Sequence, residues 1–183
     1  TIIIPGGKPP RSCIGYSLVQ LLKIIQFNGF TKTNLLEQVS ASIALLNKEK
    51  ERIKNESITI AKLLVDKLTV IYSLGTCEGV AVRFRQQINE NSKMLCWHHT
   101  LPEMNHNELV GWREKNENIA VVFLRNNKDF ERNQERMEFT KEVVSQYTKD
   151  IVEVYSKGDH DLIRSLYLIH LTDWVSFYLA ELK

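Results

Sequence analysis

The amino-terminal third of the chain carries its apolar residues at helical spacing. Residues 14–27 place an apolar side chain every three or four positions, which predicts a helix. We expect Thr33 to cap a second, largely polar helix that runs to about residue 55 and includes the charged run KEKERIKNE on a solvent-facing surface. Ser57 is then expected to cap a third helix through residue 67.

From residue 68 onward, short apolar runs alternate with amphipathic stretches. Strands are predicted at 68–73, 93–97, 118–125 and 150–156, and helices at about 80–88, 131–147 and 160–182. This alternation predicts an α/β fold, a parallel sheet with helices on both faces. Because ligands of such sheets bind beyond the carboxyl ends of the strands, we expect the site in the loop after Ser73, in residues 89–106 or in the loop after Arg125.

Charge and cysteine content narrow the class of protein. The 183 residues carry 24 Lys and Arg against 22 Asp and Glu, a net charge of +2, so a nucleic-acid partner is not expected. This length fits one domain, and no apolar run is long enough for a membrane helix, so no membrane partner is expected. The three cysteines form no CxxC pair, which favours buried free thiols and a cytoplasmic location.

Histidines and carboxylates gather between residues 83 and 112. One interpretation is a metal site whose ligands would be His98, His99, Glu103 and His106. The spacing places no two histidines one helical turn apart, and Pro102 interrupts any single helix across the segment, so the pattern does not favour a metal.

General acid–base chemistry is the second interpretation. Glu90 near the end of one helix and His106, expected to open the next, would shuttle protons if both faced one pocket. Arg11, in a proline-rich loop before a helix start, suits an anion. Each residue also has an ordinary alternative: a solvated helix glutamate, a helix-start histidine with a satisfied hydrogen bond, or a surface arginine paired with a carboxylate.

Four segments carry a resemblance to a known family. They are PPRSCIGY (9–16), QINENSK (87–93), LPEMNHNELVGW (101–112) and HLTDWVSFYLA (170–180). Over nearly its whole length the chain resembles the second sugar-isomerase (SIS) domain of the bifunctional phosphoglucose/phosphomannose isomerases. The resemblance implies a three-layer, flavodoxin-like fold. It also implies interconversion of glucose 6-phosphate and mannose 6-phosphate with fructose 6-phosphate, in glycolysis and gluconeogenesis, with no metal or organic cofactor.

The resemblance also assigns roles to single residues. Glu90 matches the catalytic base, which moves a proton between neighbouring carbons through a cis-enediol intermediate. His106 matches the ring-opening histidine, which in this family reaches the site of a neighbouring subunit, so a homodimer is expected. Arg11 matches the arginine that stabilises the enediolate. The candidates for substrate binding are their neighbours in the motifs, Ser12, Asn89 and Asn105.

Residues 1–183 resemble only one domain of a two-domain isomerase. The Ser/Thr-rich phosphate loops of the first domain have no counterpart; Ser73 and Thr76 are the nearest candidates, and ordinary turn residues are the favoured interpretation. Lys183 lies too early to match the catalytic lysine of the family's carboxyl-terminal tail. We therefore expect a truncated chain that turns over poorly alone. The alternatives are a non-catalytic sugar-phosphate-binding SIS module or a dimerisation half.

Overall fold

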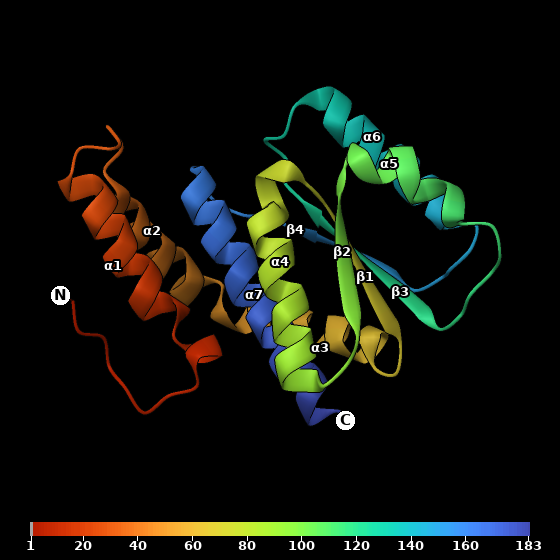
Figure 1. Cartoon of the computed structure of the whole chain (residues 1–183), viewed down its shortest axis with the longest axis horizontal. Helices are drawn as coiled ribbons and strands as arrows, with labels where there is room; N and C mark the ends of the chain where they lie inside the picture. The colour runs from red at the N-terminus through yellow and green to blue at the C-terminus, as the bar shows by residue number, and fades with distance from the viewer. Residues whose placement is uncertain (1) are drawn as a thin grey trace.

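A computed structural model describes residues 2–183 and contains one four-stranded sheet (Figure 1). Its strands are β1 (Leu68–Leu74), β2 (Cys96–Leu101), β3 (Ile119–Arg125) and β4 (Ile151–Tyr155). All neighbours pair in parallel, in the order β2-β1-β3-β4. In this register Tyr72 of β1 lies between His99 and Phe123. The predicted parallel sheet is therefore confirmed.

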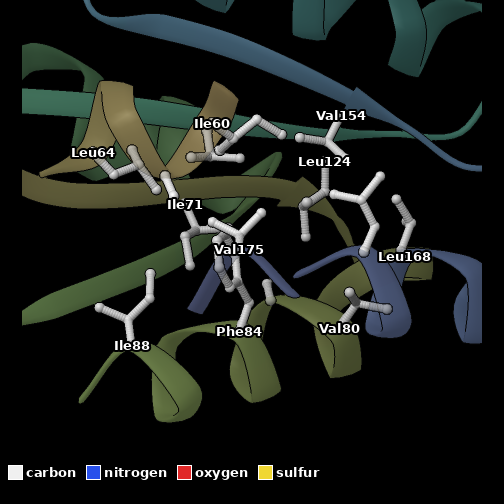
Figure 2. Packing of buried hydrophobic residues seen from close by; sticks show 14 of the residues in the cluster. Ile60, Leu64, Ile71, Val80, Phe84, Ile88, Leu124, Val154, Leu168 and Val175 are labelled. Carbon is white, nitrogen blue, oxygen red and sulfur yellow. The ribbon is translucent and has the colours of Figure 1, made fainter. Parts of the chain in front are cut away.

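Helices cover both faces of the sheet, as predicted (Figure 1). Helices α3 (Lys50–Leu64), α4 (Glu78–Gln87) and α7 (Asp161–Glu181) pack on one face, and α5 (Glu103–Asn107) and α6 (Glu131–Val144) on the other. The larger core lies under α4 and α7, where Phe84, Ile71 and Leu168 are completely buried (Figure 2). Burial of such continuous apolar surface is the main stabilising contribution to the fold.

The amino-terminal helices differ from the prediction in their boundaries. Helix α1 (Ile14–Phe27) has the predicted limits, but α2 (Leu35–Lys48) begins after Asn34, whose side chain accepts a hydrogen bond from the Glu37 amide. Thr33 is therefore not the cap. The chain breaks at Glu49, between α2 and α3, rather than near residue 55. Continuous helical spacing on either side conceals such a break in the sequence.

Ser57 is not a helix cap either. It lies in the middle of α3, is fully buried, and its hydroxyl donates to the Leu171 carbonyl of α7 at 3.0 Å. A serine satisfied in this way lets two helices approach closely, because its small side chain takes little space and leaves no unpaired hydroxyl. The long, nearly continuous apolar pattern of α7 is explained by its packing against α2 and α4 as well as α3.

The second strand is also displaced from its predicted position. Lys93 adopts a left-handed conformation that ends the turn after α4, so β2 begins at Cys96 rather than near residue 93. Cys13 and Cys77 are buried and Cys96 is half-buried, and all three are free thiols, as predicted. Burial raises the pKa of Cys77 to about 11 and of Cys96 to about 12. Every helix between residues 2 and 183 is too short or too polar to cross a lipid bilayer.

Candidate active site

Glu90 lies in a π-helical turn, η3 (Ile88–Ser92), that prolongs α4. Such turns are rare in proteins and occur frequently at functional sites. The turn is held against the core and α7. Ile88 is buried, and the buried Ser92 hydroxyl donates to the Ser176 carbonyl of α7 at 3.1 Å. Glu90 itself is exposed, so its carboxylate is open to a ligand.

Arg11 lies beside this turn. It belongs to the short helix η1 (Pro10–Ser12), and its Nε donates to Oδ1 of Asn91 at 2.8 Å. Asn91 in turn donates to the Ser176 hydroxyl at 3.0 Å. Since Asn91 is the residue after Glu90, these bonds bring the Arg11 guanidinium and the Glu90 carboxylate to one surface of the molecule.

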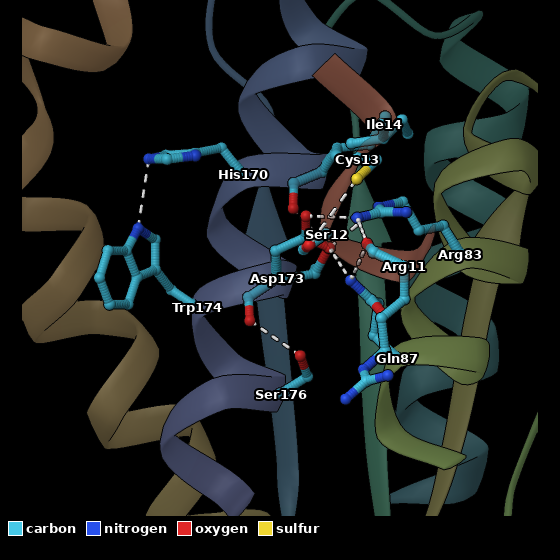
Figure 3. Close-up of polar contacts among 12 residues, drawn as sticks. Arg11, Ser12, Cys13, Ile14, Arg83, Gln87, His170, Asp173, Trp174 and Ser176 are labelled. Atoms are coloured by element: carbon cyan, nitrogen blue, oxygen red, sulfur yellow. Dashed lines mark hydrogen bonds and ion pairs between the residues drawn. The ribbon is translucent and has the colours of Figure 1, made fainter. Parts of the chain in front are cut away.

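The backbone of Arg11 is held by a polar clamp, which we define as Arg83, Gln87 and Asp173 (Figure 3). Arg83 donates to the Asp173 carboxylate through Nε at 2.9 Å and Nη2 at 2.7 Å. The Arg83 guanidinium also donates to the Arg11 carbonyl at 3.1 Å, and the Gln87 amide donates to the same carbonyl at 3.3 Å and to Asp173 at 3.1 Å. The clamp therefore joins α4, α7 and the proline loop at one point.

A cavity of about 460 Å³ opens at this point. Its lining residues are Pro9, Arg11, Ser12, Gln87, Glu90, Asn91, Lys93, Phe177 and Ala180. This volume is in the range of small-molecule sites. The cavity offers a carboxylate able to act as a base beside the cationic side chains of Arg11 and Lys93, which suit an anionic substrate or intermediate.

The cavity lies at the amino ends of the strands, whereas the sequence rule predicted a site beyond their carboxyl ends. The turn that carries Glu90 connects the end of α4 to the start of β2, and α7 contributes Phe177 and Ala180 from near its carboxyl end. The site is therefore built from the carboxyl ends of two helices. The rule for α/β sheets relies on helix amino termini, which provide free amides for anions; here arginine and lysine side chains provide the donors.

His106 lies at the other end of β2. It is exposed in the last turn of α5, which begins at Glu103, so His106 does not open that helix as predicted. A strand of the length of β2 spans about 20 Å. Helix α5 also packs on the sheet face opposite α4 (Figure 1). Within one chain, His106 and Glu90 therefore do not share a pocket.

Comparison with known proteins identifies the family of the chain. A family model described as the bacterial phospho-glucose isomerase C-terminal SIS domain matches residues 53–183. The chain belongs to this family. It is 36% identical over 196 residues to a bifunctional phosphoglucose/phosphomannose isomerase from Caldicellulosiruptor bescii and 34% identical over 181 residues to one from Aquifex aeolicus. These matches cover 99% and 98% of this chain but 56% and 54% of the relatives, so the chain spans about half the length of the curated relatives it matches.

The solved structures support the same SIS fold. A protein described as a phosphosugar isomerase from Clostridium difficile superimposes with a TM-score of 0.69 at 14% identity, covering 97% of this SIS domain and 55% of that chain. At this identity the likeness concerns the fold alone. The three-layer α/β architecture implied by the resemblance is thus confirmed.

The other predicted binding residues of the SIS domain are divided between the two ends of β2. Ser12 lines the cavity and donates its hydroxyl hydrogen to the Pro9 carbonyl at 2.8 Å. Asn89 closes its own turn by donating to the Met94 carbonyl at 2.7 Å, and it does not line the cavity. Asn105 donates to Thr140 of α6 at 2.7 Å, beside His106. Of these candidates, only Ser12 shares the cavity with Arg11 and Glu90.

The two candidate phosphate residues lie at the end of β1 and in the turn after it. Ser73 is fully buried within β1, and Thr76 donates to the Asp129 carboxylate at 2.8 Å in the following turn. Burial raises the pKa of that Asp129 carboxyl group. The Thr76 contact agrees with the ordinary turn interpretation, whereas Ser73 is a strand residue whose buried hydroxyl has no hydrogen-bond partner among residues 2–183.

The candidate metal ligands of the SIS domain do not converge. Among residues 2–183, no group of three or more His, Cys, Asp or Glu side chains is close enough to hold a metal ion. His99 pairs with Glu108 at 2.7 Å, whereas His98 points to the opposite face of the strand, where burial lowers its pKa.

Sequence reasoning did not single out the clamp around Arg11. Gln87, Asn91 and Asp173 lie inside the recognised motifs, and Arg83 precedes Gln87 by one helical turn. That spacing signals that Arg83 and Gln87 share a helix face. Their common partner, Asp173, lies ninety positions from Arg83, so only the packing of α7 against α4 brings the three together.

Proposed function

We propose that the chain is the C-terminal half of an aldose–ketose isomerase that interconverts glucose 6-phosphate and mannose 6-phosphate with fructose 6-phosphate. The placement of Glu90 and Arg11 in one cavity carries this proposal. The names of the two curated relatives support the substrate class. The free thiols support a cytoplasmic location.

The chemistry follows from the charges of the cavity. Glu90 takes a proton from the carbon beside the carbonyl group, and the electrons of that C–H bond form the double bond of a cis-enediolate. Arg11 stabilises the negative oxygen that develops. The Glu90 carboxylic acid then returns the proton to the former carbonyl carbon, whose oxygen ends as a hydroxyl group. The new carbonyl group forms on the carbon that lost the proton, as the hydroxyl hydrogen of that carbon passes to the neighbouring oxygen. Because the intermediate is planar, addition of the proton from either face gives the glucose or the mannose epimer.

Ring opening is assigned to His106, which moves a proton between the ring oxygen and a hydroxyl group. Since His106 and Glu90 lie at opposite ends of β2, we propose that each cavity receives His106 of the partner subunit in a homodimer. A shared site of this kind requires an isologous interface, in which both subunits contribute the same surface.

A sugar-phosphate-binding module without catalysis is the second candidate function. The exposure of Glu90 and its separation from His106 favour this reading for a chain that acts alone. Such a module would bind the sugar phosphate without releasing product, and Glu90→Gln would leave its ligand response intact.

The deciding assay uses fructose 6-phosphate and scores glucose 6-phosphate and mannose 6-phosphate separately, in the protein expressed from its complete reading frame. We expect both products, and a loss of kcat of at least about 1,000-fold in Glu90→Gln with substrate binding retained. Glu103→Gln is the matched control, because Glu103 accepts from Asn107 within its own short helix and does not line the cavity. Binding without product would support the second candidate instead.

A further inference from the structure

Glu108 lies at the centre of a polar network on the sheet face opposite the Arg11–Glu90 cavity. One carboxylate oxygen accepts from the Tyr72 hydroxyl at 2.5 Å and from the Trp97 indole at 3.3 Å. The other oxygen contacts Nδ1 of His99 at 2.7 Å. The Trp112 indole donates to the Tyr72 hydroxyl at 3.0 Å and completes the network.

The direction of these hydrogen bonds is fixed by the donors. An indole nitrogen can only donate. Tyr72 already accepts from Trp112, so its single hydrogen is directed at Glu108. Burial, reinforced by the Glu108 carboxylate, raises the pKa of Tyr72 far above its ordinary value, so the phenol keeps that hydrogen. Glu108 is therefore the hydrogen-bond acceptor that ties its own segment to β1 and β2.

The tied segment carries His106. Helix α5 contains five residues, too few for a helix that is stable by itself. Its orientation therefore depends on side chains that contact the rest of the fold. Before His106, Met104 is fully buried and Asn105 donates to Thr140 of α6 at 2.7 Å. After His106, Glu108 provides the attachment to the sheet.

We propose that Glu108 is a positioning residue for His106. The network holds the end of α5 against β1 and β2, so that the exposed imidazole projects from the molecule in one orientation. This proposal rests on the proposed function, because it concerns the step assigned to His106. Glu108 itself does not line the Arg11–Glu90 cavity of its own chain.

The test is a double-mutant cycle in the protein expressed from its complete reading frame. Glu108→Ala removes the acceptor, and we expect kcat for fructose 6-phosphate to fall roughly 100-fold with KM changed less than about twofold, as for a displaced catalytic group. In a His106→Ala background, Glu108→Ala is expected to lower kcat by no more than about twofold, because the group it positions is already gone. Glu103→Ala, in the same short helix, is the matched control and leaves kcat unchanged.

A milder variant keeps the test decisive if Glu108→Ala does not fold. Trp97→Phe removes one donor and keeps most of the apolar ring, and we expect an intermediate loss of kcat that disappears in the His106→Ala background. Equal losses in both backgrounds, or an unchanged kcat in folded Glu108→Ala, would overturn the positioning role. Loss of the proposed function is a different outcome, since the unmodified protein would then form no product.

Discussion

Glu90 and His106 stand at opposite ends of the same edge strand, Glu90 in the turn that precedes β2 and His106 in the helix that follows it. The segments before and after β2 are separated by the length of the strand, about 20 Å. The two residues are therefore suited to two different pockets of one chain, or to one pocket shared between two chains. The proposed isomerase requires the shared pocket.

The clamp around Arg11 gives the first prediction. Arg83→Gln removes the ion pair with Asp173 and the hydrogen bond to the Arg11 carbonyl, so the segment that carries Arg11 is held less firmly. We expect kcat to fall about 10- to 100-fold because the cationic group is displaced. The free energy of unfolding should decrease by about 2 kcal/mol, as for lost hydrogen bonds to a charged group. Steady-state kinetics and urea unfolding measure the two effects.

A matched substitution separates this effect from a general loss of positive charge. Arg132→Gln removes an exposed arginine from α6, on the far face of the sheet. We expect its kcat and its unfolding free energy to match those of the unmodified protein. Equal kinetic losses in both variants would show that the clamp has no specific role.

The second prediction concerns the pH dependence of stability. Burial lowers the pKa of His170 below 6.5, and its Nε2 accepts from the Trp174 indole at 3.2 Å (Figure 3). The unfolded imidazole therefore binds a proton at higher pH than the folded one. As the pH falls through about 6.5, the unfolded state gains protons first and stability decreases.

His170→Gln tests this sign, because an amide oxygen can accept from Trp174 but does not titrate in this range. Thermal unfolding midpoints, measured from about pH 7.5 to pH 5.5, should fall less in the variant than in the unmodified protein. An identical fall would contradict the assigned role of His170.

The third prediction distinguishes two neighbouring residues at the start of α2. Asn34 caps the helix in the structure, whereas Thr33 is the cap expected from the sequence. Asn34→Ala should lower the free energy of unfolding by about 1 kcal/mol, and Thr33→Ala by much less. Urea unfolding of the two variants measures the difference. A larger effect at Thr33 would favour the sequence-based boundary.

The fold was predictable because its two central strands, β1 and β3, are buried on both faces. The continuous apolar sequence of β3 (Ile119–Arg125) predicts a strand whatever its neighbours are. The helices that connect such strands then favour parallel pairing. The edge strand β2 was harder to place, since its sequence CWHHTL is polar and its start depends on the left-handed conformation of Lys93. The break at Glu49 has no sequence signal, because helical spacing continues across it.

The candidate site was predictable only in part. Motifs identify Arg11, Glu90 and His106 one by one, but their relative positions depend on topology. Arg11 reaches Glu90 through the packing of α4 and α7, which no local pattern encodes. The distance between Glu90 and His106 follows from the direction of β2, which becomes clear only once the sheet is assembled.

The shared pocket is tested most directly by mixing two inactive variants. Glu90→Gln protein and His106→Ala protein, each expressed from the complete reading frame, are unfolded together and refolded as mixed dimers. If each pocket combines Glu90 of one chain with His106 of the partner subunit, half of the dimers regain one intact pocket, and isomerase activity returns to about one quarter of that of the unmodified protein. If the mixture forms mixed dimers but stays as inactive as its components, the shared pocket is contradicted.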